Sequence, residues 1–496
     1  MPNLIDLNGR PFHFIGIGGI GMSALAYILA KRNLPVYGSD AKSSHITQRL
    51  QNLGAHIFLG QKASNLEIFD PKSHEQTRLS GHRRELPQII CSTAIHLSNP
   101  EYRAALELGC PIFHRSDLLA ALIQEYKSVA VAGTHGKTTT SSLISYVLLE
   151  GGLDPTVLVG GEVKAWEGNA RVGQSSYLVA EADESDGSLV KLAAQIGVIT
   201  NIELDHPDHY DSLHQVIETF QVFQQSCQTV VGCIDCPTVR EQIQPQVSYS
   251  LNQDMGADYS VDQITYESQG SSAQVWEKGQ RLGELRLKLL GSHNLSNALA
   301  AVAVGRLLGL EFATIANALE RFEGAKRRFE QRGNHNGIYF VDDYAHHPSE
   351  IQATLTAARL HVQSSYFTKA GAEGSRIIAV FQPHRYSRTH TFLQDFAQCF
   401  EQADCVIVTD IYAAGEANTT GITGQQVVDA IARYHPHVFY QQSLADVQQQ
   451  LTECLQPGDL ALFLGAGNLN QIIPETITLL QQQQSSTRGN QPVGSH

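Results

Sequence analysis

A glycine-rich segment that ends in Lys-Thr is the part of the chain best suited to chemistry. Residues 129–140 read VAVAGTHGKTTT, and an apolar-periodic segment follows to Glu150. The pattern predicts a strand, a glycine-rich turn and the start of a helix, which is the setting of a phosphate-binding loop. Backbone N–H groups and the positive end of the helix bind phosphate oxygens. The Lys137 ammonium reaches the terminal phosphates, and the Thr138 hydroxyl can hold Mg²⁺.

The spacing of the glycines in this segment leaves a second interpretation open. The usual phosphate loop has a glycine five residues before Gly136, where this chain has Val131, and Gly133 lies only three residues before it. The alternative is an ordinary strand–turn–helix with chance glycines. The lysine, the threonine and the strand context together favour phosphate binding.

An acidic cluster follows a predicted strand at residues 176–180. Residues 181–186 read EADESD and contain four acids, which predicts either a solvated turn or a Mg²⁺ site close to the phosphate loop, with Glu181 as ligand. The next strand, predicted at 197–201, runs into the segment 201–209, NIELDHPDH. Its two histidines have no helical spacing and no nearby thiolate, so we do not expect a zinc site.

Two further regions place polar residues at predicted strand ends. Residues 16–21 read GIGGIG after a strand at 11–17, and Asp40 follows about 20 residues later, which alone would indicate a site for NAD. Near the C-terminus, the segments 341–348 and 381–388 also follow strands. Arginines in the second segment could bind carboxylates or phosphates, and an exposed loop with surface arginines is the alternative.

Alternating strands and helices predict an α/β protein of three domains, each built on a largely parallel sheet. We expect a Rossmann-like domain at 1–120, a central nucleotide-binding domain at 121–328, a Rossmann-like domain at 329–480 and a disordered tail at 481–496, with surface loops at 71–87 and 364–375. Further strands are predicted at these ranges: 35–38, 88–91, 111–113, 337–341, 376–381, 405–409 and 460–464.

Composition excludes several classes of protein. Of the 496 residues, 42% are apolar and 17% are charged, and the net charge is 35 − 49 = −14, which disfavours nucleic acid or an anionic membrane as a general partner. We see no signal peptide and no apolar run long enough to span a membrane. Eight scattered cysteines, with one isolated CxxC at 233–236, favour packing over zinc or redox chemistry and a reducing cytoplasm.

Nine motifs in this order, between residues 11 and 470, closely resemble those of the Mur ligase family: HFIGIGGIGMSALA, GSD, AGTHGKTTT, EADESD, NIELDH, GSHNLSNALAA, KRRFE, VDDYAHHPSEI and FQPHRYSRT. The last two resemble the branch that attaches the first amino acid of the peptidoglycan stem peptide. The sister branch that recycles murein peptides is the nearest alternative. An NAD-linked dehydrogenase would leave the phosphate loop unexplained, and a non-catalytic nucleotide switch would leave the C-terminal motifs unexplained.

The resemblance implies a role for each matching residue. It implies ATP binding by Gly133, Thr134, His135, Gly136, Lys137, Thr138, Thr139, His293, Asn294, Asn297, Arg328 and Asp343. It implies UDP-sugar binding by Gly18, Gly19, Gly21, Ser39 and Asp40, and alanine binding by Tyr344, His346, Arg385 and Arg388. The implied metal ligands are Thr138, Glu181 and His206, and the implied catalytic residues are Lys137, Glu181, His206 and Arg328.

The implied reaction joins L-alanine to the carboxylate of UDP-N-acetylmuramate through an acyl phosphate, with ATP and Mg²⁺, and releases ADP and phosphate. A histidine on Mg²⁺ is chemically unusual, because this hard ion prefers oxygen. The residues do not indicate an oligomeric state, or whether glycine or serine can replace alanine.

Overall fold

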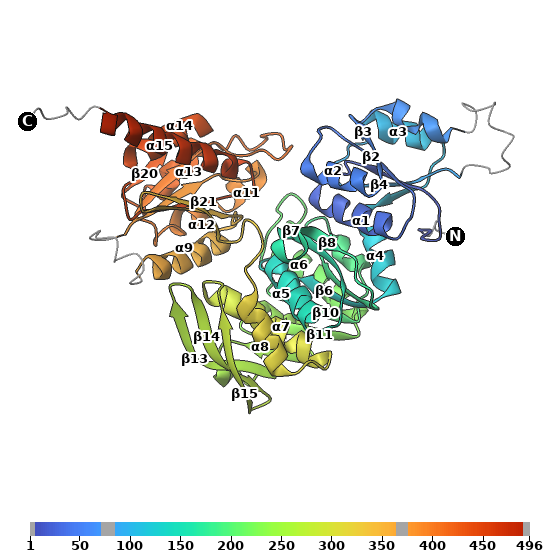
Figure 1. Cartoon of the computed structure of the whole chain (residues 1–496), viewed down its shortest axis with the longest axis horizontal. Coiled ribbons are helices and arrows are strands. Elements are labelled where there is room, and N and C mark those ends of the chain that lie inside the picture. Colours follow the sequence, from blue (N-terminus) through green and yellow to red (C-terminus); the bar gives the residue numbers. More distant parts are fainter. Residues whose placement is uncertain (1–4, 71–84, 364–374, 490–496) are drawn as a thin grey trace, which may run out of the picture. The chain divides into compact units, whose positions relative to one another are not determined.

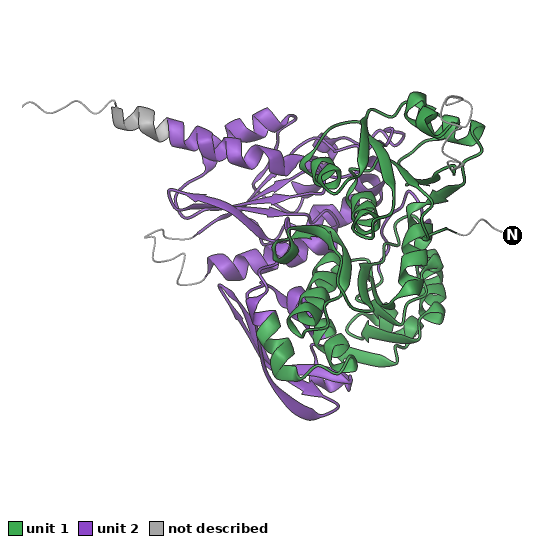
Figure 2. Cartoon of the chain, turned by 45° about the vertical axis from the view of Figure 1, so that its right-hand side comes forward, with its two compact units in different colours: residues 1–202, 214–249, 300–318 green, residues 203–213, 250–299, 319–496 purple. Residues whose placement is uncertain are grey.

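A computed structural model describes residues 5–70, 85–363 and 375–489 (Figure 1). These residues form two compact units (Figure 2). Unit 1 comprises residues 1–202, 214–249 and 300–318, and unit 2 comprises 203–213, 250–299 and 319–496. The strands form three sheets, which are largely parallel, so the predicted α/β class is confirmed. The predicted loops at 71–87 and 364–375 lie largely outside the described residues.

The first sheet of unit 1 has five parallel strands in the order β3-β2-β1-β4-β5. Its strands are β1 (Phe12–Ile15), β2 (Val36–Asp40), β3 (His56–Leu59), β4 (Gln88–Cys91) and β5 (Ile112–His114). Its helices are α1 (Ile20–Lys31), α2 (His45–Asn52), η1 (Ala63–Phe69), α3 (Pro100–Glu107) and α4 (Arg115–Glu125). The central strand β1 is fully buried, as expected for a parallel strand covered on both faces. The order matches a doubly wound nucleotide-binding fold, which has its ligand crevice at the carboxyl ends of the strands.

The second sheet has ten strands, of which seven belong to unit 1, in the order β12-β11-β10-β6-β9-β7-β8; among these seven only β8 is antiparallel to its neighbour. Its strands are β6 (Lys127–Ala132), β7 (Thr156–Val163), β8 (Gly168–Arg171), β9 (Tyr177–Glu181), β10 (Ile196–Ile199), β11 (Thr229–Cys233) and β12 (Val247–Ser250). Helices α5 (Lys137–Glu150) and α6 (Leu213–Ser226) follow β6 and β10, with short turns η3 (Lys164–Trp166), η4 (Ser188–Lys191) and η5 (Val239–Ile243). Helix α5 packs on β6, β7 and β9, which brings the predicted phosphate loop to the centre of the sheet.

Unit 2 contains an antiparallel group that the sequence did not predict, β13 (Tyr259–Glu267), β14 (Gly270–Glu277) and β15 (Gln280–Leu287). The third sheet has the order β16-β17-β21-β18-β19-β20, with only β16 antiparallel. Its strands are β16 (Glu330–His335), β17 (Ile338–Asp343), β18 (Ile377–Phe381), β19 (Cys405–Val408), β20 (Val438–Tyr440) and β21 (Leu460–Leu464). Its core consists of fully buried strands such as β18 and β21.

The helices of the C-terminal half are η6 (Gln253–Met255), α7 (Ser292–Leu307), α8 (Phe312–Arg321), α9 (Pro348–Val362), α11 (Tyr386–Thr391), α12 (Leu393–Gln398), α13 (Gly424–Ile431), α14 (Leu444–Cys454), η7 (Leu469–Ile472) and α15 (Ile473–Gly489). The prediction of a disordered tail from residue 481 is wrong for residues 481–489, because α15 continues to Gly489. Glutamine is a good helix former, and the run of glutamines extends a helix that is already anchored. Residues 490–496 lie outside the described residues.

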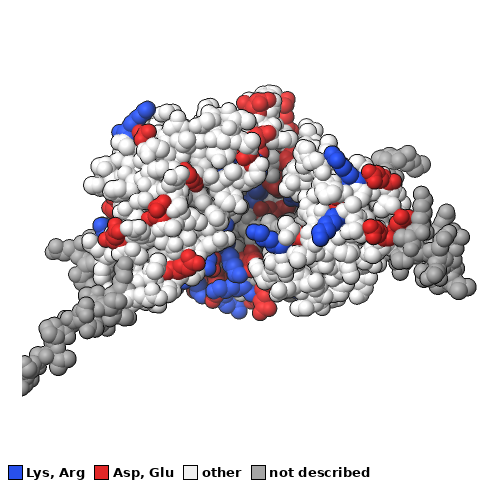
Figure 3. All heavy atoms as spheres, turned by 90° about the horizontal axis from the view of Figure 1, so that it is seen from above, with Lys and Arg blue, Asp and Glu red and all other residues white. Residues whose placement is uncertain are grey.

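Charge is sparse on the surface, in agreement with the charged content of 17% (Figure 3). The face in Figure 3 is mostly uncharged, and its basic side chains have acidic ones interspersed among them. Among the described residues, no helix combines the length and the hydropathy that a bilayer span requires. The eight cysteines are all free thiols, so no disulfide supports the fold.

Candidate active site

The predicted phosphate loop connects β6 to α5 in unit 1. Strand β6 ends at Ala132, α5 begins at Lys137, and between them Gly133 and Gly136 have φ of +139° and +82°. Residues other than glycine rarely adopt these backbone conformations. In addition, a Cβ atom on Gly133 would overlap the hydroxyl oxygen of Thr200. The backbone therefore requires both glycines, and the strand–turn–helix that the sequence predicts is confirmed.

The end of the neighbouring strand β10 fixes the shape of this loop. The backbone N–H of His135 donates to Asn201 Oδ1 at 2.8 Å, and that of Thr134 donates to the Asn201 carbonyl at 3.0 Å. Thr200 donates its hydroxyl to the His135 carbonyl at 2.6 Å. These bonds hold the loop backbone from outside, which pre-organises it for an anion at the start of α5.

Lys137 lies over the loop rather than in solvent. Its Nζ donates to the carbonyls of Gly133 and Thr134 at 2.7 and 3.2 Å and lies 2.8 Å from a carboxylate oxygen of Glu184. Burial alone would lower the pKa of Lys137, but the nearby carboxylates of Glu184 and Asp183 raise it above its usual value. Lys137 is therefore a permanent cation at the mouth of the loop.

The acidic segment after β9 divides its four acids between different partners. Glu184 binds Lys137, while Asp183 and Asp186 accept from Nη2 of Arg115 at 2.8 and 3.3 Å. Glu181 accepts from the backbone N–H of Gly160 at 2.7 Å and forms no ion pair within the described residues. Glu181 is also the register partner of Val131 in β6, at the strand end that leads into the phosphate loop. Its carboxylate oxygens and the Thr138 hydroxyl are donors that Mg²⁺ prefers, so these residues fit the metal.

The glycine-rich loop of the first sheet is tied to the end of β2. The Gly18 N–H donates to Asp40 Oδ2 at 2.8 Å, and a Cβ on Gly18 would lie only 2.8 Å from the same oxygen. The first residue before α1, Gly19, offers no side-chain cap, so the orphan N–H groups of the first turn can take an anion. Ser39 is fully buried, and its hydroxyl donates to Glu101, so this hydroxyl does not face a ligand.

In unit 2, three residues predicted to bind ATP, His293, Asn294 and Asn297, lie at the start of α7. Burial lowers the pKa of His293 to about 4, and the Arg328 guanidinium acts in the same direction. Asn294 donates its side-chain amide to the Leu290 carbonyl at 2.8 Å, and Asn297 donates to Asn294 Oδ1 at 3.4 Å. His293 is therefore neutral near pH 7, and the two asparagines support the helix start.

Predicted ATP and alanine residues meet at the end of β17. The Arg328 guanidinium lies 5.2 Å from the centre of the Tyr344 ring, and the Tyr344 and His346 rings are 5.4 Å apart at their centroids. Asp343 accepts from the backbone N–H groups of Phe329 and Ala345 at 2.7 and 2.8 Å, and burial raises its pKa to about 6. Asp343 thus fixes the backbone at Ala345, next to Tyr344, and at Phe329, next to Arg328.

Arg388, predicted to bind alanine, is 2% exposed and already holds a carboxylate. Its Nε and Nη2 donate to the two oxygens of Asp205 at 2.8 and 3.2 Å, and Nη2 lies 3.4 Å from Nδ1 of His206. Burial alone would raise the pKa of Asp205, but Arg388 holds it well below its usual range. The Arg388 guanidinium beside His206 opposes a metal cation there, so the prediction of His206 as a metal ligand rests on the resemblance alone.

Arg385 is more accessible than Arg388 and lies at the start of α11. Its Nη1 donates to Asp208 Oδ2 at 2.8 Å and lies 3.8 Å from Glu416. Glu416 also accepts from the backbone N–H groups of Tyr386 and Ser387 at 2.6 and 3.1 Å. Arg385 has φ of +69°, an unfavourable conformation for a side chain, and these bonds hold it in place.

Two histidines of the same region are uncharged. Burial lowers the pKa of His346 to about 4 and that of His384 to about 2. His384 stacks on Tyr412 at a centroid distance of 5.8 Å, and Arg388 Nη1 lies 3.1 Å from His384 Nδ1. The positive charge for an incoming carboxylate must therefore come from the arginines.

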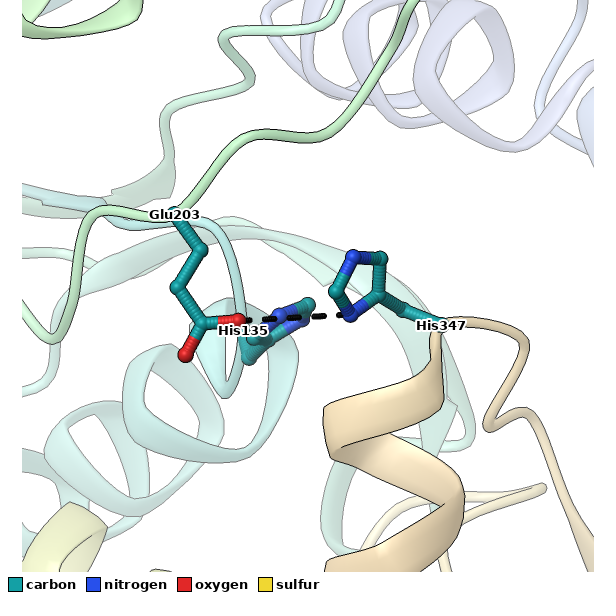
Figure 4. A group of neighbouring side chains, drawn as sticks. All are labelled: His135, Glu203 and His347. Atoms are coloured by element: carbon teal, nitrogen blue, oxygen red, sulfur yellow. Dashed lines mark ion pairs between the residues drawn. The ribbon is translucent and has the colours of Figure 1, made fainter. Parts of the chain in front are cut away.

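Helix α9 begins beside Glu203. Glu203 Oε2 accepts from the Ser349 hydroxyl at 2.8 Å and lies 4.0 Å from His347 Nδ1, the pair that Figure 4 shows. The His347 side chain caps α9, because its Nδ1 accepts from the Ser349 N–H at 3.4 Å. A carboxylate at a helix N-terminus is electrostatically favourable, so this contact stabilises the segment after Tyr344.

Three family models match successive parts of the chain. They are the Mur ligase family catalytic domain at residues 11–127, the Mur ligase middle domain at 131–305 and the Mur ligase glutamate ligase domain at 327–467. The chain belongs to the Mur ligase family.

Close relatives of this Mur ligase are named UDP-N-acetylmuramate–L-alanine ligase. That of Nostoc punctiforme is 63% identical over 480 residues, which cover 96% of this chain and 98% of the relative. That of Gloeothece citriformis is 61% identical over 498 residues, covering 96% and 99%. The predicted Mur ligase resemblance is confirmed.

Solved Mur ligases share the whole architecture. The UDP-N-acetylmuramate-alanine ligase of Thermotoga maritima has a TM-score of 0.76 at 28% identity, and the similarity covers 96% of this chain and 99% of that one. The murein peptide ligase of Psychrobacter arcticus has a TM-score of 0.69 at 22% identity, covering 95% and 99%, which shows a common fold. Both likenesses span the chain rather than one domain.

The structure brings together several predicted site residues of this Mur ligase. In unit 1, the phosphate loop and Glu181 lie at the carboxyl ends of the adjacent strands β6 and β9. A hydrogen bond connects the Gly18 N–H to the Asp40 carboxylate. Unit 2 places Arg328, Tyr344 and His346 in contact. The assigned roles of these residues stay predictions.

Several residues that contact the predicted site residues of this Mur ligase were not predicted from the sequence. Those that contact predicted site residues are Arg115, Glu184, Glu101, Asp205, Asp208 and Glu416. Glu184 and Asp205 lie within motifs already identified, EADESD and NIELDH, so the signal for them was present. Asp208 lies in the segment 201–209, which was also identified, whereas Arg115, Glu101 and Glu416 lie outside these segments and are revealed only by the three-dimensional fold.

Proposed function

We propose that this Mur ligase joins L-alanine to the carboxylate of UDP-N-acetylmuramate in the cytoplasm, with ATP and Mg²⁺. The observation that carries the proposal is the phosphate loop whose Lys137 is held as a cation beside Glu184, in a chain 61–63% identical to relatives named for this reaction. The proposed domains are 1–120 for the UDP-sugar, 121–328 for ATP and 329–480 for alanine.

In the first step, a carboxylate oxygen of UDP-N-acetylmuramate attacks the γ-phosphorus of ATP. The bond from this phosphorus to the bridging oxygen breaks, and ADP leaves with an acyl phosphate formed. Lys137 and the loop N–H groups stabilise the charge that spreads over the phosphoryl oxygens. Mg²⁺ held by Thr138 and Glu181 would neutralise phosphate charge. Phosphate oxygens compete with Glu184 for Lys137, and burial raises the pKa of Glu184 to about 7, which eases this exchange.

In the second step, the neutral amine of L-alanine attacks the acyl carbon. The carbon–oxygen bond to phosphate breaks, the proton that the amine loses passes to the leaving phosphate, and hydrogen phosphate departs as the amide forms. Arg385 supplies a charge-assisted bond to the alanine carboxylate, and Arg388 orders the pocket through Asp205. Tyr344 and His346 offer neutral surfaces that suit a methyl side chain.

A phosphate-release assay tests the acceptor. ATP, Mg²⁺ and UDP-N-acetylmuramate are supplied with L-alanine, glycine, L-serine, L-glutamate or a murein tripeptide, one at a time. We expect L-alanine to give the highest kcat/KM, with glycine and serine lower, because one methylene in an apolar pocket is worth only about 1–3 kcal/mol. Preference for the tripeptide would move the chain to the recycling branch, and preference for glutamate to a later ligase of the family.

A further inference from the structure

A fully buried carboxylate lies beneath the glycine-rich loop of the first sheet. Glu101, in the first turn of α3, has 0% exposure, and its Oε1 accepts from His13 Nε2 at 2.8 Å and from Asn65 Nδ2 at 2.9 Å. Its Oε2 accepts from the Ser39 hydroxyl. Three donors from three other elements, β1, η1 and β2, therefore converge on one carboxylate.

The burial of this group is costly unless every oxygen is satisfied. His13 is also 0% exposed, and its ring packs near Phe58 and Phe69 at centroid distances of 6.1 Å. Nδ1 of His13 has no hydrogen-bond partner within the described chain, which fits the tautomer that carries its proton on Nε2 and donates to Glu101. Apolar side chains of the same total volume would fill this space at a lower free-energy cost. The polar network is therefore not explained by stability alone and points to a role in function.

The network continues from Glu101 to the loop that we propose for the UDP-sugar. Asn65 also donates to the Gly60 carbonyl at 2.9 Å, and the Gly60 N–H donates to the Asp40 carbonyl at 2.7 Å. The Ser39 carbonyl accepts from the N–H groups of both Gly16 and Ile17 at 2.9 Å.

All three hydrogen bonds between the end of β2 and the glycine-rich loop are thus accepted by residues that the network holds, Ser39 and Asp40. The Ser39 hydroxyl is bound to Glu101 directly, and Asp40, whose carboxylate receives the Gly18 N–H, is bound through Asn65 and Gly60. A shift of Glu101 would therefore be transmitted to Gly16 and Gly18 together.

We propose that Glu101 is a positioning residue for UDP-sugar binding, which it serves by fixing Ser39 and Asp40 against the glycine-rich loop. The inference rests on the proposed function, because it takes UDP-N-acetylmuramate as the ligand of this loop. Glu101 is enclosed by protein and touches no substrate, so its effect is on the geometry of the loop N–H groups.

The test compares Glu101→Gln, Glu101→Ala and Ser39→Ala with the parent chain, and Glu107→Gln, an exposed acid on the same helix, is the matched control. We expect KM for UDP-N-acetylmuramate to rise about tenfold or more in Glu101→Ala, while KM for ATP and for alanine and kcat at saturation change little. Glu101→Gln keeps the shape of the side chain and one of its two acceptor oxygens, so the rise in KM for UDP-N-acetylmuramate should be smaller. Calorimetry with UDP-N-acetylmuramate should show the same order of affinities.

The possible outcomes distinguish a failure of the positioning role of Glu101 from a failure of the proposed ligase function. If Glu101→Ala does not fold, Glu101→Gln and Ser39→Ala carry the test alone. Folded variants whose KM for the UDP-sugar equals that of the parent would overturn the positioning role, and so would equal rises of all three Michaelis constants. A parent chain that neither binds nor turns over UDP-N-acetylmuramate would instead overturn the proposed function.

Discussion

At the scale of single residues, Lys137 is the group whose charge the proposed phosphoryl transfer needs most. Lys137→Ala should lower kcat by about 10²–10³-fold or more, because one preorganised donor to developing charge is worth that much. The melting temperature should fall, because the substitution removes an ion-pair partner of the buried Glu184, so circular dichroism must show that the variant is folded at the assay temperature. Lys127→Ala, an exposed lysine of the same unit, is the control and should keep full activity. A folded Lys137→Ala variant with parental kcat would remove the phosphate-loop assignment.

Arg385 should decide the affinity for alanine. Arg385→Ala removes a charge-assisted bond to the substrate carboxylate, worth about 1.5–3 kcal/mol, so KM for alanine should rise roughly 10- to 100-fold. KM for ATP should stay near the parental value. The exposed Arg433→Ala provides the control. Equal rises for ATP and alanine would show a general disturbance of unit 2 rather than a lost alanine contact.

The Asp205–Arg388 pair should show itself in the pH dependence of stability. Asp205→Asn leaves a buried guanidinium unpaired, which should lower the free energy of unfolding by about 3–5 kcal/mol near neutral pH. The folded-state pKa of Asp205 lies well below its usual value of 3.8. The stabilisation is therefore fully present above that value and is lost as pH falls through the folded-state pKa.

Denaturant titrations at several pH values measure this effect. The difference between the parent and Asp205→Asn should be largest above pH 4–5 and should shrink in more acid solution. The exposed Asp395→Asn should show no comparable difference at any pH. A difference that is constant with pH would mean that the Asp205 charge contributes nothing beyond its hydrogen bonds.

Where a motif carries a chemical meaning, the sequence predicts where a candidate residue lies in the fold, while the role of that residue stays a prediction. Lys137 and Glu181 follow from their positions after apolar strands, and the structure places both at one sheet edge. The partners Arg115 and Glu101 could not be predicted, because Arg115 pairs with acids 68 and 71 residues away and Glu101 binds Ser39 62 residues away. Such pairings depend on which strands become neighbours, and a single sequence does not state that order.

At the scale of elements, the strand ends determine where a metal can bind. Glu181 closes β9 beside the phosphate loop, and Glu181→Gln replaces a charged oxygen with a neutral amide. The Mg²⁺ concentration for half-maximal turnover should rise several-fold, with Glu241→Gln as an exposed control. His206→Ala should do the same if His206 is a ligand, although Arg388 lies beside it. Overlaid magnesium titrations for either variant would exclude that residue from the metal site.

Strands that are buried on both faces of a sheet were predicted more accurately than strands with one exposed face. Strands such as β4 and β21 have the predicted bounds, because an apolar run between turns has few other interpretations. The antiparallel strands β13–β15 were missed, although β13 alternates between exposed and half-buried residues toward its end. A strand with polar residues on one face gives a period-two pattern, which is a weaker signal than a continuous apolar run. For this reason no separate strands were predicted in this segment.

At the scale of the whole molecule, the net charge of −14 opposes the binding of the two anionic substrates that we propose, ATP and UDP-N-acetylmuramate. Binding then depends on local features, the glycine-rich loops, two helix N-termini and a few arginines, rather than on a general positive field. Substrate binding should therefore depend on the loop geometry more than on ionic strength. This is consistent with the acidic side chains that lie among the basic ones on the face in Figure 3.

The distribution of the proposed roles makes ATP turnover depend on the other substrates. Lys137 and Glu181 belong to unit 1, whereas Arg328 and the alanine residues belong to unit 2, so neither unit carries the full set of proposed groups. Phosphate release from ATP alone should be a small fraction of the rate with all substrates, because no carboxylate is present to accept the phosphoryl group and an ordered site excludes water. Adding UDP-N-acetylmuramate without alanine should permit acyl-phosphate formation, detectable as trapping by hydroxylamine, with slow net turnover. Steady phosphate release from ATP alone at the rate of the complete mixture would contradict the ligase assignment and identify the chain as a simple ATPase.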